Sequence, residues 1–94
     1  LPTRVALHQN EPNPFNPQTT ISFDLPESGP VELSVYDVRG QRVAVLVDGP
    51  MPRGRHEIAW KGRDTDGRSV PAGIYFCRLT TDKSVESKAM VVIR

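Results

Sequence analysis

Residues 20–36 read TISFDLPESGPVELSVY, and the spacing of apolar residues in this stretch decides the fold class. Apolar side chains occupy every second position on both sides of a turn rich in proline and glycine at residues 26–30. Successive side chains of a β-strand point to opposite faces, so this alternation is typical of strands with one buried face. The stretch predicts two strands, Thr20–Leu25 and Val31–Tyr36.

The rest of the chain repeats this pattern. Residues 41–47, QRVAVLV, are apolar on both faces and suit either a covered strand or a short helix, but their β-branched content favours a strand. Three further strands are predicted at His56–Trp60, Gly73–Thr80 and Val85–Ile93, and a possible edge strand at Val5–Leu7.

Turn signals separate these segments at intervals of about ten residues, as expected for a sandwich of short strands. They lie at Asp37–Gly40, Asp48–Gly54, Gly62–Gly73 and Asp82–Lys83, with Asp66-Gly67 as the expected tip of the longest loop. No amphipathic helix is visible. The sequence therefore predicts an all-β protein, a small antiparallel immunoglobulin-like β-sandwich of about seven strands. The aromatic residues expected in the core or at its edge are Phe23, Tyr36, Trp60, Tyr75 and Phe76.

The composition excludes several classes of function. The chain has 94 residues, enough for one small domain, with 12 basic and 11 acidic residues and a net charge of +1. That balance gives no electrostatic basis for binding nucleic acid or an anionic membrane. No apolar run approaches the roughly 20 residues of a transmembrane helix. The single cysteine, Cys77, lies in an apolar run and is expected to be a buried hydrophobe.

No catalytic motif is present, so we expect no enzyme activity and no cofactor. The two histidines, His8 and His56, lie in no recognisable nucleophile motif. Most acidic residues occupy strand positions expected to face solvent: Asp24, Glu32, Glu57 and Glu86. The weak candidates for a metal site are Asp64 and Asp66, whose spacing before Gly67 resembles the start of a calcium loop, but the later ligands of such a loop are missing. The same residues also form a good turn.

Three segments are more specific than strand and turn formation requires. They are LHQNEPNPFNP at residues 7–17, followed by TTI at 19–21; YDVRGQRV at 36–43; and WKGRDTDGRSVPAGIY at 60–75. Together with the ending KAMVVIR at 88–94, their order and spacing resemble the type A C-terminal sorting domain of type IX secretion cargo. The immunoglobulin-like domain of the flagellar hook-capping protein shares the third pattern. Glu11 and Lys61 depart from residues common in the sorting family.

The resemblance implies transport rather than catalysis. Residues 1–10 would be a linker or edge strand that follows an upstream cargo domain, and residues 11–94 the sorting domain. The partners implied are the outer-membrane type IX translocon and its associated sortase, and the protein would pass through the periplasm to the cell surface or the medium. The domain would be a monomer or a weak dimer.

The resemblance also assigns roles to residues. Translocon recognition would involve the final strand, through Lys88, Met90, Val91, Val92, Ile93 and Arg94. Structural roles are expected for Asn13, Phe15, Asn16, Trp60, Gly67, Gly73 and Tyr75. We predict that the prolines of residues 10–20 hold an extended entry segment in which Phe15 is buried. Two alternative functions remain: a structural spacer like the hook-cap domain, and a carbohydrate-binding module that would need a row of exposed aromatic residues.

Overall fold

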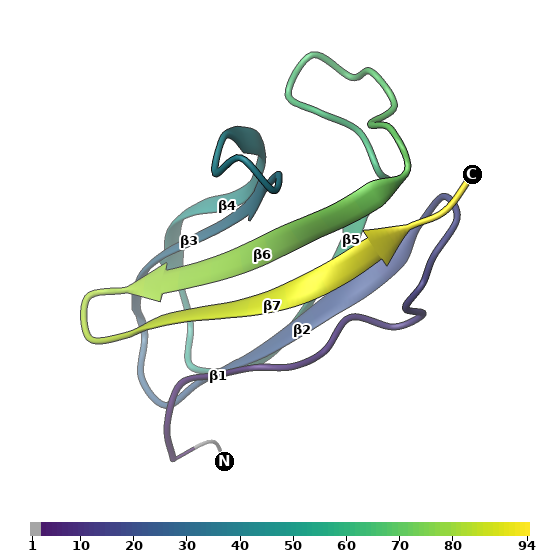
Figure 1. The fold of residues 1–94 in the computed structure, drawn as a ribbon. Helices are drawn as coiled ribbons and strands as arrows, with labels where there is room; N and C mark the ends of the chain where they lie inside the picture. Colours follow the sequence, from purple (N-terminus) through teal and green to yellow (C-terminus); the bar gives the residue numbers. More distant parts are fainter. Residues whose placement is uncertain (1–2) are drawn as a thin grey trace.

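The computed structural model describes residues 3–94 and confirms the predicted all-β architecture (Figure 1). Each predicted strand is present, and the ambiguous segment at residues 41–47 is part of a strand. No helix long and apolar enough to cross a membrane occurs in the described part of the chain. The strands are β1 (Ala6–Leu7), β2 (Thr19–Leu25), β3 (Gly29–Tyr36), β4 (Arg42–Met51), β5 (Gly54–Trp60), β6 (Gly73–Thr81) and β7 (Val85–Val92).

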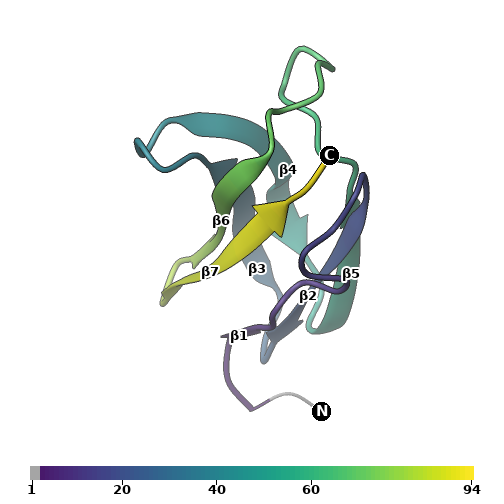
Figure 2. The ribbon, with the colours of Figure 1, turned by 45° about the vertical axis from the view of Figure 1, so that its right-hand side comes forward.

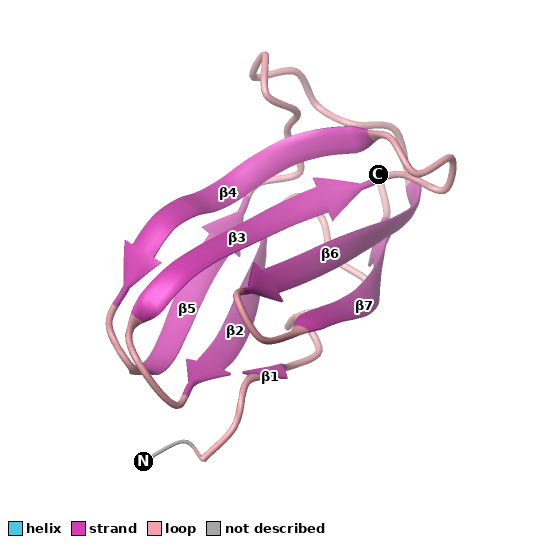
Figure 3. Ribbon diagram, turned by 90° about the vertical axis from the view of Figure 1, so that its left-hand side faces the viewer, coloured by secondary structure: helices cyan, strands magenta, loops and turns pink. Residues whose placement is uncertain are grey.

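The strands form two antiparallel sheets that face each other (Figure 3). One sheet has the order β1-β2-β5 and the other the order β4-β3-β6-β7. The chain changes sheets between β4 and β5 through only two residues, Pro52 and Arg53. The prediction of a loop at Asp48–Gly54 is therefore wrong for residues 48–51, which belong to β4, and for Gly54, which begins β5. Pro50 lies in β4, which is an edge strand, and there its missing N–H leaves no ladder hydrogen bond unmade.

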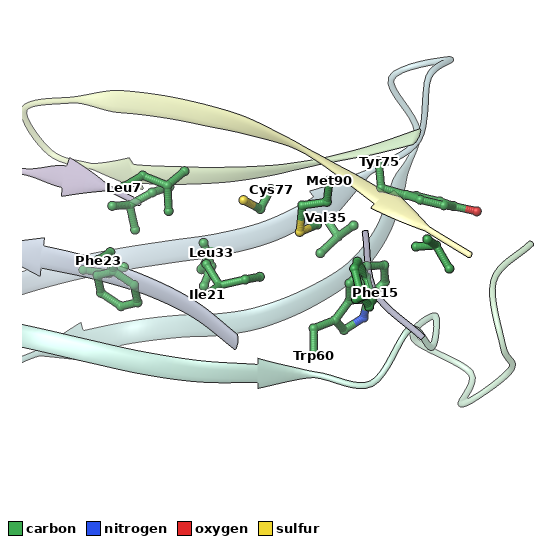
Figure 4. Close-up of a cluster of buried hydrophobic side chains, with 14 of the residues drawn as sticks. Leu7, Phe15, Ile21, Phe23, Leu33, Val35, Trp60, Tyr75, Cys77 and Met90 are labelled. Atoms are coloured by element: carbon green, nitrogen blue, oxygen red, sulfur yellow. The ribbon is translucent and has the colours of Figure 1, made fainter. Parts of the chain in front are cut away.

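The core lies between the sheets and is built from the alternating residues identified in the sequence. Ile21 and Phe23 of β2 face Leu33 and Val35 of β3, and all four side chains are fully buried (Figure 4). The complete set of buried apolar residues is Leu7, Phe15, Ile21, Phe23, Leu25, Val31, Leu33, Val35, Ala44, Trp60, Val70, Tyr75, Cys77, Leu79, Met90 and Val92. Burial raises the pKa of the Cys77 thiol to about 11, so the thiol stays protonated near neutral pH.

Two positional predictions were wrong, for Phe76 and Glu86, because alternation gives relative faces but not which face is buried. Phe76 is 37% exposed and lies beside half-buried Tyr36 on the outer face of the four-stranded sheet. Glu86 is opposite buried Leu79, so it belongs to the inner side of β7 rather than facing solvent. Its carboxylate is half-buried and accepts the backbone N–H of Leu7 at 2.9 Å, which joins the two sheets at their open side.

A polar network ties the three strands of the smaller sheet together on its outer face. Asp24 of β2 accepts hydrogen bonds from the Arg55 guanidinium of β5 at 2.8 Å, and lies 2.8 Å from the His8 Nε2 that follows β1. The hydrogen bond from Arg55, supported by His8, lowers the pKa of Asp24 to about 2, although partial burial opposes the shift. The charged carboxylate is thus favoured in the folded state.

We predict that Asp24→Asn reduces the free energy of unfolding at pH 7 by about 1–2 kcal/mol, a value discounted because Arg55 is exposed. The folded-state pKa lies below the unfolded value near 3.9, so this stabilisation is complete above about pH 5 and is lost as the pH falls through about 2. Urea unfolding at several pH values measures the difference. The control Asp48→Asn removes an exposed carboxylate outside the network. A difference between wild type and Asp24→Asn that stays constant from pH 7 to 2 would contradict the assignment.

Candidate functional site

The entry loop, residues 8–18 between β1 and β2, is closed at its base by a buried polar cluster. Asn10 and Thr19 are each 1% exposed. The Asn10 side-chain amide donates to the Thr19 hydroxyl at 3.0 Å, and that hydroxyl donates to the Pro12 carbonyl at 2.8 Å. Glu11 and Thr20 exchange two backbone hydrogen bonds beside the cluster. Every buried polar side-chain atom in residues 3–94 has a hydrogen-bond partner, so the loop enters the fold without an unsatisfied buried side-chain group.

The tip of the entry loop runs beside the last strand, although the two segments are nearly eighty residues apart (Figure 2). Phe15 donates its N–H to the Val91 carbonyl and accepts the Ile93 N–H, both at 3.0 Å. The Asn13 side-chain carbonyl accepts the Val91 N–H at 2.9 Å, which satisfies the group as a neighbouring strand would. Farther along, the Gln9 amide donates to the Ala89 carbonyl at 2.7 Å. The loop therefore covers the C-terminal half of the β7 edge, from Ala89 onward.

Phe15 is the anchor of this loop, and the prediction that it is buried is confirmed. It is 1% exposed and meets Trp60 edge-on, with 5.6 Å between ring centroids. Trp60 in turn meets Tyr75 edge-on at 5.9 Å, so three aromatic rings from distant segments fill this end of the sandwich (Figure 4). Each polar atom finds a backbone acceptor: the Trp60 indole N–H donates to the Arg63 carbonyl, and the Tyr75 hydroxyl to that of Pro71.

The other residues with expected structural roles differ in their contacts. Asn13 forms the bond to β7 described above, whereas Asn16 is exposed and its side chain has no hydrogen-bond partner in residues 3–94. Gly67 has φ of 82° at the tip of the loop between β5 and β6. Gly73 opens β6 with φ of 153°.

The Asp64 and Asp66 pair, considered as a weak metal candidate, is organised as a turn. The Asp64 carboxylate accepts the backbone N–H groups of Asp66 at 2.9 Å and Arg68 at 3.0 Å. The described part of the chain contains no group of three or more side chains arranged to hold a metal ion. The Asp-x-Asp-Gly pattern thus shapes the loop that precedes β6.

The side chain of Arg94 is hydrogen-bonded to the loop between β5 and β6. The Arg94 guanidinium donates to the carbonyl oxygens of Val70 and Gly62. Gly62 lies against the entry loop as well, because a Cβ at this position would be 3.0 Å from the Pro17 carbonyl oxygen. The entry loop, the β5–β6 loop and the chain end therefore meet at one point.

The six proposed recognition residues divide into two groups. Met90 and Val92 are at most 1% exposed and belong to the core, so a partner cannot contact them while the domain is folded. Lys88, Ile93 and Arg94 are exposed and Val91 is half-buried. Val91 lies opposite exposed Ile74 on the outer face of the four-stranded sheet.

Sequence reasoning missed the apolar strip that Ile74 and Phe76 form on this outer face. The signal was present, because both residues alternate with Tyr75 and Cys77, which face the core. The strip does not offer a row of free aromatic faces for sugar binding. The Arg78 guanidinium lies 4.2 Å from the centre of the Tyr36 ring and covers it.

Comparison with known proteins gives a family match and several similar folds. The family model described as FlgD Ig-like domain matches residues 10–84. No curated protein matches the chain. A solved structure of FLGD from P. aeruginosa is 27% identical, with a TM-score of 0.62 over 79% of this chain and 59% of that one.

Two further structures come from Porphyromonas gingivalis and show the same fold. PorZ, described as an essential bacterial surface component of the type IX secretion system, is 21% identical with a TM-score of 0.62. Dimeric latent PorU is 19% identical with a TM-score of 0.72. The matches cover 96% and 97% of this chain, but the chain spans only 11% and 10% of those proteins.

We predict that Phe15→Ala lowers the free energy of unfolding by about 3–5 kcal/mol, as for other buried phenylalanines. The substitution removes the ring from Trp60 and leaves a cavity at the end of the core. The matched control Phe76→Ala removes the same ring from an exposed site and should cost less than about 1 kcal/mol. Denaturant unfolding followed by circular dichroism measures both, and equal losses for the two variants would contradict the anchoring role of Phe15.

Gly62→Ala and Gly67→Ala form a second matched pair. Both positions have positive φ, at 70° and 82°, so both variants should lose about 1 kcal/mol or more from backbone strain. Only the Cβ at residue 62 presses on the Pro17 carbonyl, whereas residue 67 has open space around it. We expect Gly62→Ala to cost at least about 1 kcal/mol more than Gly67→Ala in thermal unfolding. Equal losses of stability in the two variants would show that the contact between Gly62 and the entry loop does not contribute to stability.

Proposed function

The chain belongs to the FlgD Ig-like domain family, and we propose that it is a non-catalytic recognition domain, specifically a C-terminal sorting domain that directs cargo through the type IX translocon. Its partners would be the outer-membrane translocon, the associated sortase and a cargo domain upstream in the same chain. The destination would be the cell surface or the medium, and the domain itself a monomer or weak dimer.

The observation that carries this proposal is the pairing of the entry loop with the final strand. These are the two segments whose sequences most specifically resemble sorting domains, and Asn13 and Phe15 bond directly to Val91 and Ile93. The FlgD family match ends at residue 84, before β7 begins at Val85. The similarity to PorZ and PorU, in contrast, extends over 96% and 97% of the chain. Of the two paired segments, β7 thus lies outside the family model, whereas the entry loop from residue 10 onward lies within it.

The structure narrows which side chains a translocon would contact. A partner that binds the folded domain reaches Lys88, Ile93 and Arg94 together with the outer side of Val91, but not Met90 or Val92. Deleting residues 88–94 would remove two core side chains as well as the signal. A useful test must therefore change exposed atoms only.

We predict that replacing Lys88 by alanine and Ile93 by serine together lowers export of a fused reporter at least tenfold in a type IX-competent host. Ile93 is 48% exposed, so its loss should leave the core intact. The control Val85→Ser changes an apolar residue that is 63% exposed at the other end of β7, and should be exported normally. Reporter activity in washed cells and medium measures export, and thermal unfolding checks the fold. Normal export of a folded Lys88→Ala, Ile93→Ser fusion would refute recognition through these side chains.

A structural spacer is the second candidate function, and the FlgD family match over residues 10–84 favours it. A spacer would need the fold but not the exposed residues of β7. The same fusion distinguishes the two functions, because a spacer domain would not export the reporter whether or not the residues of β7 are changed.

A further inference from the structure

The outer edge of β7 is only half covered. Residues whose backbone groups point away from a neighbouring strand alternate along a strand, and on β7 these include Ser87, Ala89 and Val91. The entry loop satisfies Val91 on both groups and Ala89 on its carbonyl. The N–H and C=O of Ser87 and the N–H of Ala89 have no backbone partner within residues 3–94. β1 lies beside this half of the edge, where the Leu7 N–H bonds the Glu86 carboxylate, but it leaves these three backbone groups unpaired.

The tip of the entry loop has one buried side chain, in addition to its hydrogen bonds with β7. Of residues 11–18, only Phe15 is buried, and the others are exposed. The base of the loop is fixed separately by Asn10 and Thr19, so the tip can leave without disturbing that cluster. A single ring in a pocket with strand-like hydrogen bonds on either side is the way an extended peptide binds to a sheet edge.

We propose that the β7 edge and the pocket of Phe15 form a peptide-binding site that the chain fills with its own entry loop. The ligand is an extended segment of another protein that carries an aromatic residue two positions after an asparagine. The entry loop itself shows this chemistry. The amide oxygen of Asn13 meets the Val91 N–H, the backbone of Phe15 pairs with Val91 and Ile93, and the ring meets Trp60.

The direction of the ligand follows from the same contacts. Phe15 and Val92 form a parallel bridge, so the entry loop runs in the same direction as β7. An incoming segment in this direction meets the open groups of Ser87 and Ala89 before it reaches Val91. It gains hydrogen bonds that the chain itself does not make, because Leu7 bonds the side chain of Glu86 and Gln9 bonds only the carbonyl of Ala89. The inference does not depend on the sorting proposal and applies equally to a spacer.

The test uses the 94-residue chain with Phe15→Ala, which vacates the pocket, and a peptide with the sequence of residues 9–17, QNEPNPFNP. We expect this peptide to raise the melting temperature of the variant by at least about 4 °C at saturation. The same peptide with alanine in place of phenylalanine should produce no shift. Trp60 is the only tryptophan and contacts the pocket, so its fluorescence reports binding directly.

Wild-type protein is the competition control. Its own Phe15 fills the pocket, so binding of the peptide should be at least tenfold weaker than to Phe15→Ala. If Phe15→Ala does not fold without peptide, Asn13→Ala replaces it, because that variant keeps the ring and loses only the Val91 contact. It should bind the peptide at least tenfold more tightly than wild type.

Three results would overturn the proposal. The first is no binding of the phenylalanine peptide to a folded variant. The second is equal binding by wild type and variant, which would place the peptide elsewhere. The third is a wild-type dimer in analytical ultracentrifugation that excess peptide does not dissociate, which would assign the edge to a second copy of the chain.

Discussion

The contact of Phe15 with Trp60 is the constraint on which this end of the molecule depends. Two sheets of three and four strands form a sandwich that is open where β7 and the start of the chain approach each other. A ring from the entry loop closes that opening, and its backbone pairs with the last strand. In a domain of this size the core is thin, so one fully buried aromatic side chain accounts for a large part of the net stability. The entry loop and β7 are consequently held together at this end of the sandwich.

The proline-rich composition of the entry loop is explained by this role. An ordinary strand placed on the β7 edge would leave its own outer edge unpaired and would extend the sheet toward other molecules. Prolines lack the N–H group that such pairing needs. The loop instead satisfies β7 through the side-chain amides of Gln9 and Asn13 and the backbone of a single residue, Phe15. It covers the C-terminal half of the β7 edge without creating a new edge.

The strands were predictable from the sequence because alternation depends on local residues alone. Which face of a strand is buried, and which strand lies at an edge, depends on partners that are distant in the chain. Phe76 and Glu86 were misplaced for this reason, since each follows the pattern of its strand but lies on the face opposite to that expected. The continuation of β4 through Pro50 was missed because proline is compatible with a strand only at an edge. The bonds between Asn13, Phe15 and β7 leave no periodic signal, and only the aromatic residue among the prolines indicated a buried anchor.

The burial pattern of β7 distinguishes two ways in which a partner could recognise this strand. Its inward residues Met90 and Val92 hold the core, whereas Val91 and Ile93 are accessible on the outer side and are bonded to the entry loop. A partner that recognises the folded domain therefore encounters the outer residues and the loop together, as a single surface assembled from both ends of the sequence. A partner that required the inward residues would first have to remove β7 from the core, at the expense of the fold. If the domain is recognised in its folded form, we therefore expect changes in the entry loop to affect that recognition, even though the loop lies far from β7 in sequence.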